Sequence, residues 1–578
     1  MGDSRCCNSE GDQTITCRGY RYKASLGKYQ PTVAKEIGRL SQENIVARIW
    51  KKDYTVWKPT PDEISNRMGW LDSPAVMSTK TAEINDFREE VYADGFRQAL
   101  LLGMGGSSLA PEVFANIFGR GGNSLKLSVL SSTDPMEVLK QEEWSKKEKT
   151  LFIVSTKSGG TIETISFMKY FYNSASKQVG ADKAGDYFIA ITDPGSGLEE
   201  IAKKLKFRRI FLNNPCIGGR YSALSYFGLL PAALIGVDTE TILNKGKYTA
   251  TDTSKRENNL AALLGCSMGA LSKEGRDKTT FILSPKIAHF GRWLEQLIAE
   301  STGKEGKGVL PVIEETFDSP ERYSRDRLFT YIKVDGDNSQ DTIVNGLINS
   351  GEPVVEIVLD SIYDLGGQFI LWEVATVIAG WSLGINPYDQ PNVESSKVLS
   401  NEIITKYREE GRLPEIGAAI EDNGLAVYTD VAATNIDNVL SKFISQGIKE
   451  GKSYASIQAF IEPTEENETL LKELRKKIGG ESGIATTLGF GPQFLHSTGQ
   501  LYKGDGGGGI FIQFVSATQK DAVIPDEGKK IPLSFGILKR AQMLGDRESM
   551  LRAGRKVISF DLGNNIKGNL KRLTEGYK

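Results

Sequence analysis

Short apolar runs alternate with helical patterns from residue 98 onward, and this alternation limits the chain to a small set of folds. The predicted strands are Ala99–Leu102, Leu125–Leu130, Leu151–Ser155, Tyr187–Thr192 and Arg209–Leu212. Several are followed by predicted helices, at Leu109–Phe118, Thr161–Tyr172 and Tyr221–Ile235. Strands that alternate with helices in this way predict a parallel sheet with helices on both faces.

The same alternation starts again after a polar stretch near Tyr248–Glu257. The second set of predicted strands is Thr280–Ser284, Gly308–Glu314, Leu328–Val334 and Val354–Leu359. A long apolar helix is predicted after them, at Gln368–Gly384. Beyond Lys397, predicted helices mix with strand-like runs, at Ile436–Gln446, Thr469–Ile478, Ser456–Ile461, Ile510–Ala517 and Lys556–Leu562. This last third is either a third α/β segment or an elaboration of the second.

A chain of 578 residues is too long for one ordinary core, so we expect several domains. The predicted fold class is α/β, with two doubly wound parallel-sheet domains, a helical N-terminal arm and an α/β C-terminal segment. The expected boundaries are 1–85 for a leader and helical arm, 86–250 and 251–400 for the two domains, and 401–578 for the C-terminal segment. The polar start of the leader is expected to be disordered, and the role of Cys6, Cys7 and Cys17 is open.

The charge balance argues against a nucleic-acid or membrane partner. The 71 Lys+Arg and 73 Asp+Glu leave a net charge of −2, so no bulk field attracts either. The longest apolar run, Phe227–Val237, is interrupted by Pro231 and is shorter than the ~20 residues of a membrane span. The amino terminus lacks the features of a signal peptide, and the odd number of cysteines, five, argues against a disulfide framework. A cytoplasmic location is therefore expected.

The sequence contains only two histidines, His289 and His496, and no C-x-x-C pair accompanies them. A zinc site is therefore not expected, and we predict neither a metal ion nor a cofactor. Any acid–base histidine must be one of these two.

Two predicted strand-to-helix turns carry glycines and hydroxyls suited to an anion. The first, LLLGMGGSSLAP at 100–111, has glycines that allow close backbone approach, and Ser107 and Ser108 add hydroxyls. Ser108 stands where a G-x-G-x-x-G motif has its last glycine, so the turn is a weak match to a dinucleotide-binding site. The second, VSTKSGGTIET at 154–164, opens a helix whose first N–H groups attract an anion. Either turn alone also fits ordinary capping, but two at successive carboxyl ends of a parallel sheet indicate a ligand crevice.

The segment Phe290–Gly308 predicts a helix that ends on a carboxylate. Its apolar residues recur at helical spacing, and Gly303 is suited to end the helix. Gln296 and Glu300 stand four residues apart and therefore share one face. A carboxylate in the last turn faces the negative end of the helix dipole, which disfavours its charge and suits a general base. A solvated Glu at a helix end is the alternative that this stretch alone leaves open.

Three further segments hold polar residues at predicted loop-to-helix junctions. Arg220 follows two glycines in CIGGRYSALS, where a contact with a ligand oxyanion and an ordinary surface position are both consistent with the sequence. Lys397 comes one helical turn after Glu394 in NPYDQPNVESSK, which also fits a solvated turn. His496 lies in FLHSTGQLYKG, where a structural and a catalytic histidine fit equally well.

Five motifs, in sequence order, resemble segments of the glucose-6-phosphate isomerase family. They are GMGGSSLAP, STKSGGTIET, GGRYS, QLIAESTGK and QPNVESSK. Two more, ATTLGFGPQFLHSTGQLYKGD and IPLSFGILKRAQMLGD, bring the chain closest to the isomerase half of bifunctional transaldolase/glucose-6-phosphate isomerases. The resemblance covers most of Ala47–Leu562 and implies two sugar-isomerase (SIS-type) domains. It also implies interconversion of glucose 6-phosphate and fructose 6-phosphate through a cis-enediol, without a cofactor; any transaldolase partner is left open.

Carried over by motif position, the resemblance implies a role for each candidate residue. The substrate phosphate would be held by Gly106, Ser107, Thr156, Lys157, Ser158 and Thr161, with Gln390 near it. Arg220 would stabilise the charge of the enediolate, because it is always ionised. Gln296 would position the sugar and Glu300 would move the proton between C2 and C1. Lys397 and His496 would open the sugar ring.

The position of the histidine differs from the family arrangement, in which it lies between the Glu and Lys motifs and comes from the neighbouring subunit. No histidine lies between Glu300 and Lys397 here, since His496 follows both and His289 is expected to be structural. A site completed within one chain is therefore possible, and a monomer and a homodimer are both open. The alternative functions are a phosphosugar sensor without chemistry and an isomerase of another phosphosugar, such as mannose 6-phosphate.

Overall fold

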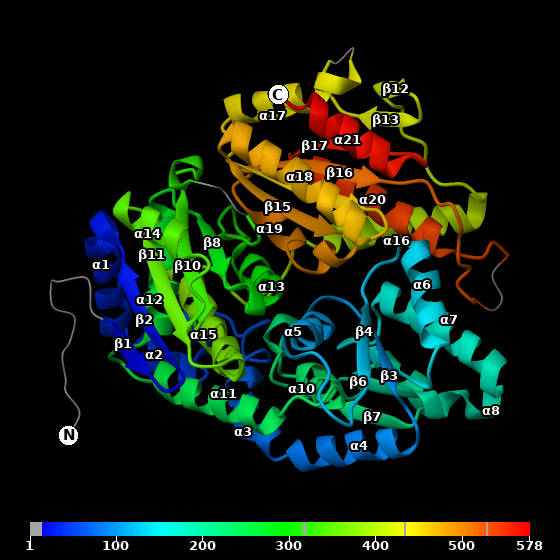
Figure 1. Ribbon diagram of the computed structural model, residues 1–578, viewed down its shortest axis with the longest axis horizontal. Coiled ribbons are helices and arrows are strands. Elements are labelled where there is room, and N and C mark those ends of the chain that lie inside the picture. The colour runs from blue at the N-terminus through cyan, green and yellow to red at the C-terminus, as the bar shows by residue number, and fades with distance from the viewer. Residues whose placement is uncertain (1–13, 316–318, 433–434, 527–529) are drawn as a thin grey trace.

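The computed structural model describes residues 14–315, 319–432, 435–526 and 530–578. Within these residues the chain forms three sheets, each flanked by helices, and Figure 1 shows them as three neighbouring bodies that meet near the centre of the molecule. The start of the leader, with Cys6 and Cys7, lies outside the described residues.

The first sheet is parallel throughout and has the strand order β4-β3-β5-β6-β7. Its strands are β3 (Gln98–Gly103), β4 (Lys126–Leu130), β5 (Thr150–Ser155), β6 (Phe188–Thr192) and β7 (Arg209–Leu212). Its helices are α5 (Leu109–Phe118), α6 (Pro135–Ser145), α7 (Ile162–Val179), α8 (Ala181–Ala184), α9 (Gly197–Lys204) and α10 (Tyr226–Leu234). All the strands predicted for this part of the chain are confirmed.

The strand order of this sheet places a crevice at one point. The chain runs from β3 to β4 on one side and then returns to β5 on the other side of β3. In an open parallel sheet, ligands bind beyond the carboxyl ends of the strands where the order reverses in this way. Both glycine- and hydroxyl-rich turns follow β3 and β5, so they meet at this reversal.

The second sheet has the order β1-β2-β11-β10-β8-β9, and β8 to β11 are parallel. These parallel strands, all predicted, are β8 (Lys278–Leu283), β9 (Leu310–Val312), β10 (Arg327–Val334) and β11 (Val354–Leu359). The helices around this sheet are α11 (Thr239–Thr253), α12 (Leu260–Lys273), α13 (Phe290–Thr302), α14 (Asp341–Asn349) and α15 (Leu365–Leu383).

The sequence pattern predicts a helical N-terminal arm, but the arm also contains two strands. A hairpin of β1 (Ile15–Cys17) and β2 (Tyr20–Ser25) lies antiparallel along β11 and forms the edge of the second sheet. In β2 the buried Tyr20 and Tyr22 alternate with the charged Arg21 and Lys23. So short an alternation is easily taken for a polar leader. The helices of the arm are α1 (Gln30–Gln42), α2 (Ile45–Trp50), α3 (Ser73–Ser78) and α4 (Thr81–Ala93).

The last third of the chain builds a sheet of its own, with the order β12-β13-β17-β16-β14-β15. Its strands are β12 (Ile420–Asp422), β13 (Leu425–Tyr428), β14 (Tyr454–Phe460), β15 (Ala485–Phe490), β16 (Gly509–Val515) and β17 (Lys556–Asp561). Its helices are α16 (Glu394–Glu410), α17 (Ile436–Lys449), α18 (Glu465–Ser482), α19 (Gly499–Gly504), α20 (Phe535–Arg552) and α21 (Ile566–Gly576). It is therefore a third α/β segment and not an extension of the second sheet; the exact domain boundaries stay a prediction.

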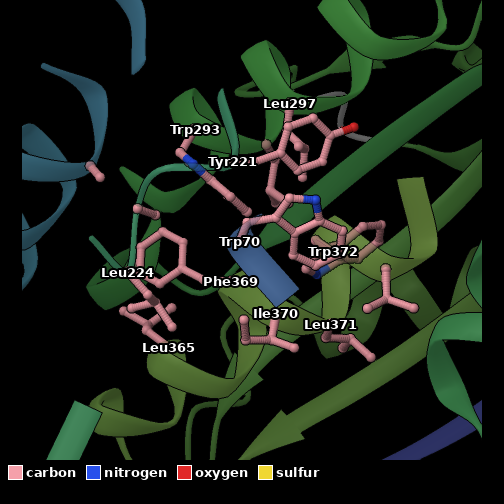
Figure 2. Packing of buried hydrophobic residues seen from close by; sticks show 14 of the residues in the cluster. Trp70, Tyr221, Leu224, Trp293, Leu297, Leu365, Phe369, Ile370, Leu371 and Trp372 are labelled. Carbon is pink, nitrogen blue, oxygen red and sulfur yellow. The ribbon is translucent and has the colours of Figure 1, made fainter. Parts of the chain in front are cut away.

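The largest core lies under the second sheet and around α15. Trp70, Trp293 and Trp372 are fully buried there, and Figure 2 shows Phe369 on α15 among them. Among the described residues one helix, Ile362–Leu383, is long and apolar enough to cross a membrane, but 89% of its apolar window is buried inside the protein. Because α15 is packed on all sides, apolar residues occur all round it.

Candidate active site

A cavity of about 850 Å³ opens at the carboxyl ends of β3 and β5. Its walls come from the first sheet, from α13, from α16 and from the C-terminal segment. It is lined by every residue predicted for the site: Glu300, Arg220, Lys397, His496, Gly106, Ser107, Thr156, Lys157, Ser158, Thr161, Gln296 and Gln390. The fold therefore brings together all the segments that the motifs single out.

The turn after β3 is pressed against two other parts of the cavity wall. A Cβ atom at Gly106 would lie 2.1 Å from the carbonyl oxygen of Gly219, so only glycine fits between the two loops. Gly105 has a positive φ of 53°, and a Cβ there would lie 2.8 Å from the carbonyl oxygen of His496. The hydroxyl of Ser108 is buried and donates to the Gly105 carbonyl at 3.2 Å, so it serves the turn and not the cavity.

The turn after β5 leads directly into α7, with Thr161 as the N-cap residue. The Thr156 and Thr161 hydroxyls lie 3.1 Å apart, and the Ser158 hydroxyl accepts from the Gly160 amide at 3.3 Å. The free N–H groups and positive end of a helix start favour an anion at this place. This turn is the part of the cavity best suited to a phosphate.

Lys157 does not present an unpaired charge to this turn. Its ammonium pairs with the Asp193 carboxylate and donates to the Pro215 carbonyl at 2.8 Å. Burial raises the pKa of Asp193, although Lys157 and Arg67 oppose that shift. The sequence pattern identifies Lys157 as a cation at the turn but does not reveal its partner.

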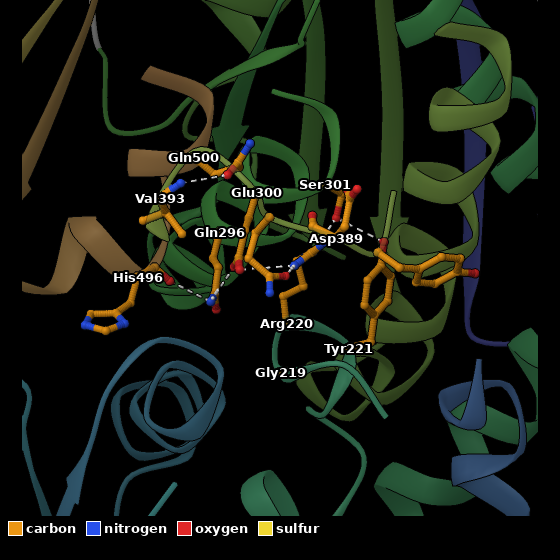
Figure 3. Close-up of polar contacts among 12 residues, drawn as sticks. Gly219, Arg220, Tyr221, Gln296, Glu300, Ser301, Asp389, Val393, His496 and Gln500 are labelled. Carbon is orange, nitrogen blue, oxygen red and sulfur yellow. Dashed lines mark hydrogen bonds and ion pairs between the residues drawn. The ribbon is translucent and has the colours of Figure 1, made fainter. Parts of the chain in front are cut away.

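Glu300 lies in the last turn of α13, as predicted, and Gly303 follows as the C-cap. Its Oε2 accepts from Gln296 Nε2 at 3.0 Å, which confirms the shared face. Its Oε1 lies 3.1 Å from Arg220 Nη1, a contact that helix position alone does not predict. Figure 3 shows the chain of contacts from His496 through Gln296 and Glu300 to Arg220. The negative end of the helix dipole disfavours the charge of Glu300, and the guanidinium of Arg220 stabilises that charge.

Arg220 is 2% exposed, and each of its nitrogens faces protein oxygens. Nε donates to the Ser301 hydroxyl at 2.7 Å. Nη2 donates to the carbonyls of Pro387 and Asp389 at 2.7 and 3.1 Å. Nη1 donates to Gln390 Oε1 at 3.0 Å, besides its contact with Glu300. Gln390 is thus a partner of the Arg220 guanidinium.

Lys304 is a buried cation behind this pair that sequence reasoning did not single out. It is 1% exposed, and its ammonium donates to Asp389 Oδ1 at 2.7 Å and contacts the Asp389 carbonyl. Burial and the nearby Arg220 lower its pKa to about 8, against the opposing effect of Asp389. Its position at the end of the motif QLIAESTGK was the signal available in the sequence.

His496 lies in the C-terminal segment, in a short 3-10 helix, Gln493–His496. Its Nε2 is 2.9 Å from Glu163 Oε1, and its backbone carbonyl accepts from Gln296 at 2.8 Å. The Glu163 carboxylate is 4% exposed. Burial acts to raise the pKa of Glu163, but His496, a backbone N–H and Lys397 act against it together, and the pKa is lowered. Glu163 belongs to the motif STKSGGTIET, yet only the fold reveals its pairing with His496.

Lys397 lines the cavity from α16, where its ammonium pairs with Glu394 Oε1 at 2.6 Å. Both side chains are about half exposed, at 46% and 57%, so this ion pair lies at the cavity mouth. An exposed pair of this kind is weak and easily exchanged for a ligand contact.

A second cavity, of about 880 Å³, lies between α13 and α18 and is lined by the exposed His289. Arg292 contacts Glu314 and Glu468 at 3.7 and 3.3 Å, and Lys472 contacts the same two carboxylates at 3.0 and 2.9 Å. None of the predicted site residues lines this second cavity, so the first cavity is the candidate active site.

The fold and the cavity define a class: doubly wound α/β proteins with a glycine- and hydroxyl-rich turn and a carboxylate–guanidinium pair at the strand-order reversal. The model of the phosphoglucose isomerase family matches residues 75–310. Glucose-6-phosphate isomerase of Thermosynechococcus vestitus is 30% identical over 370 residues, covering 55% of this chain and 69% of that protein. The chain belongs to the phosphoglucose isomerase family.

A second relative agrees with this assignment, and a solved structure shares the fold. Glucose-6-phosphate isomerase of Listeria monocytogenes is 27% identical over 419 residues, covering 62% of this chain and 91% of that protein. The crystal structure of a glucose-6-phosphate isomerase from Chlamydia trachomatis superposes with a TM-score of 0.58 at 17% identity, covering 68% of this chain and 90% of that one. The structural likeness supports the fold.

Proposed function

We propose that the protein is an aldose–ketose isomerase that interconverts glucose 6-phosphate and fructose 6-phosphate. The observation that carries this proposal is the Glu300–Arg220 contact at 3.1 Å, in the same cavity as the phosphate-suited turn before α7. A sensor of phosphosugars would need the turn but would gain nothing from a carboxylate held against a buried guanidinium.

The phosphate is proposed to bind at the start of α7. Thr156, Ser158 and Thr161 offer hydroxyls, and the first amides of the helix offer N–H groups. Gly106 and Ser107 extend the same surface from the turn after β3. The Lys157 ammonium lies at the same turn and would reach the phosphate by exchanging its Asp193 partner for it. The sugar then extends toward Gln296 and Glu300.

Proton transfer is proposed to use Glu300 as the base. Its carboxylate takes the proton from C2 of the open-chain aldose, the C2–H electron pair forms a C1=C2 double bond, and the carbonyl pair moves onto O1. Return of the proton to C1 and transfer of the O2 hydroxyl proton to O1 complete the ketose. Glu300 is neutral in the intermediate, so its attraction to Arg220 weakens as the enediolate gains charge. The guanidinium can thus exchange one anionic partner for the other without moving out of its buried position.

Ring opening is proposed to use His496 and Lys397. A carboxylate only accepts hydrogen bonds, so Glu163 favours a proton on His496 Nε2 and leaves Nδ1 to exchange protons in the cavity. Lys397 gains a substrate oxygen in place of Glu394 at the cavity mouth. One then serves the ring oxygen and the other the anomeric hydroxyl.

All of these proposed residues come from a single chain. We therefore propose that one subunit holds a complete site, which is compatible with a monomer and with a homodimer. A cytoplasmic location is also proposed, since the free thiols of Cys17, Cys216 and Cys266 fit a reducing compartment.

The test is to follow fructose 6-phosphate and mannose 6-phosphate by NMR after addition of the protein. We expect fructose 6-phosphate to equilibrate with glucose 6-phosphate, and Glu300→Gln to abolish this conversion. Glu402→Gln, which removes an exposed carboxylate on α16, is the matched control and should retain it. Binding without conversion would favour a sensor, and faster turnover of mannose 6-phosphate would favour the other isomerase.

A further inference from the structure

The C-terminal segment supplies a second contact to Glu163 besides His496. Gln542 lies on α20, within the motif IPLSFGILKRAQMLGD, and its side chain is 3% exposed. Its Nε2 donates to Glu163 Oε1 at 2.7 Å, the same oxygen that His496 Nε2 contacts at 2.9 Å. Two donors from the third α/β segment thus converge on one carboxylate of the first.

The orientation of the Gln542 amide is fixed at its other end. Its Oε1 accepts from the Thr133 hydroxyl at 2.8 Å, so a flipped amide would lose that bond and turn its oxygen toward Glu163. Thr133 is fully buried, just before α6. The amide therefore bridges the first sheet and Glu163 in one orientation.

Helix α20 is held against the first sheet by a second buried contact. Lys539, one helical turn before Gln542, pairs with Asp134 at 2.8 Å, and the two side chains are 2% and 4% exposed. Residues three apart on a helix share a face, so the ion pair and the amide bridge lie side by side. This docking determines where Gln542 meets Glu163.

We propose that Gln542 is a positioning residue, which holds the Glu163 carboxylate so that His496 keeps its proton on Nε2 and presents Nδ1 to the substrate. A buried carboxylate that loses one of its donors is left under-satisfied and turns toward other donors or water, away from the geometry that the lost bond fixed. Without Gln542, Glu163 is free to reorient and the His496 ring is no longer held in one tautomer. The catalytic consequence rests on the proposed isomerase function, whereas the effect on the histidine does not.

The protein allows a direct test, because His289 and His496 are its only histidines. In protein labelled with ¹⁵N-histidine and examined at a pH alkaline enough to make the ring neutral, the ring nitrogens of His496 should report the tautomer protonated at Nε2. In Gln542→Met the two ring ¹⁵N shifts of His496 should move toward each other, as the tautomers mix. The exposed His289 serves as the internal reference and should not change.

Steady-state kinetics distinguish a role of Gln542 in positioning His496 from a role in substrate binding. Gln542→Met should lower kcat for fructose 6-phosphate by about tenfold, the scale of one hydrogen bond to a charged group, and leave KM within about twofold. Thr133→Val removes only the anchor of the amide and should change both readouts in the same direction by less. Arg540→Leu removes an ion pair with Asp561 from the same helix and should change neither.

Unchanged His496 shifts in a folded Gln542→Met protein would overturn the proposal. If that variant does not fold, Thr133→Val decides in its place, and wild-type shifts there would likewise overturn it. A wild-type protein without isomerase activity would refute the proposed function, while the NMR comparison would still decide the role of Gln542.

Discussion

Arg220 Nη1 lies 3.1 Å from Glu300 Oε1, although the two residues belong to segments that follow strands of different sheets. Arg220 follows β7 of the first sheet, and Glu300 ends α13, which follows β8 of the second. The proposed proton transfer depends on this contact, because it lets negative charge pass from the carboxylate to the substrate beside one fixed guanidinium.

Replacing Arg220 by Lys tests that dependence. A lysine keeps the charge but cannot reach Ser301, Gln390 and the Pro387 carbonyl together, so the counter-charge is no longer fixed. We expect kcat to fall roughly 100-fold or more, with a smaller change in KM. Steady-state kinetics against Arg209→Lys, an ion-paired arginine outside the cavity, provide the comparison. Wild-type kcat in Arg220→Lys would refute the role.

Ring opening can be separated from proton transfer by the choice of substrate. A 5-deoxy analogue of fructose 6-phosphate has no 5-hydroxyl and cannot close its furanose ring. We expect His496→Asn and Lys397→Met to slow turnover of fructose 6-phosphate by about 100-fold, which is the scale of general acid–base catalysis. Both variants should convert the analogue at the wild-type rate. Lys406→Met, an exposed lysine on the same helix as Lys397, is the control. Equal losses on both substrates would contradict this division of roles.

Lys304 should give the enzyme an alkaline limit. Burial and Arg220 lower its pKa to about 8, so its charge, and the ion pair with Asp389, are lost as the pH rises through that value. The carbonyls of the loop around Asp389 hold Arg220, and a weaker anchor should loosen them. We expect kcat to decline above about pH 8 and Lys304→Arg to move the decline to higher pH. An identical pH–rate profile in the variant would exclude Lys304 as the cause.

Glu295 should make the protein less stable as the pH rises toward neutrality. Burial raises its pKa from 4.5 to about 7, although Arg292 and Arg475 oppose the shift. Between these values the folded protein binds a proton that the unfolded chain does not, so the free energy of unfolding falls as the pH increases.

Glu295→Gln, which mimics the protonated acid, should therefore have nearly the wild-type Tm at pH 5 and a higher Tm at pH 8. Glu473→Gln changes the net charge equally at an exposed position on α18 and should show no such difference. A Glu295→Gln effect that is independent of pH would contradict the assignment.

The sequence predicts the parts of this protein that depend on local patterns. The parallel strands of the first two sheets are apolar runs, and Gln296 and Glu300 share a helix face because of their spacing. Strand β15 was not predicted, because Ala485–Phe490 contains threonines and a glycine instead of a continuous apolar run. Each predicted site residue lines one cavity because the motifs follow strands whose carboxyl ends converge.

Pairings across the fold could not be predicted in this way. The contacts of Arg220 with Glu300, of Lys157 with Asp193 and of His496 with Glu163 each join residues from separate elements. No local pattern reports such a distance. The position of His496 late in the chain becomes intelligible only once the third sheet is seen to dock on the first.

Deuterium exchange tests most directly whether Glu300 moves the proton between C2 and C1. Fructose 6-phosphate is incubated with the protein in deuterated water, and the glucose 6-phosphate formed is examined by NMR at C2. We predict deuterium at C2 with the wild-type protein. With Glu300→Gln we predict no exchange, while affinity for the phosphosugar is largely retained. Exchange at the wild-type rate in Glu300→Gln would show that Glu300 is not the base.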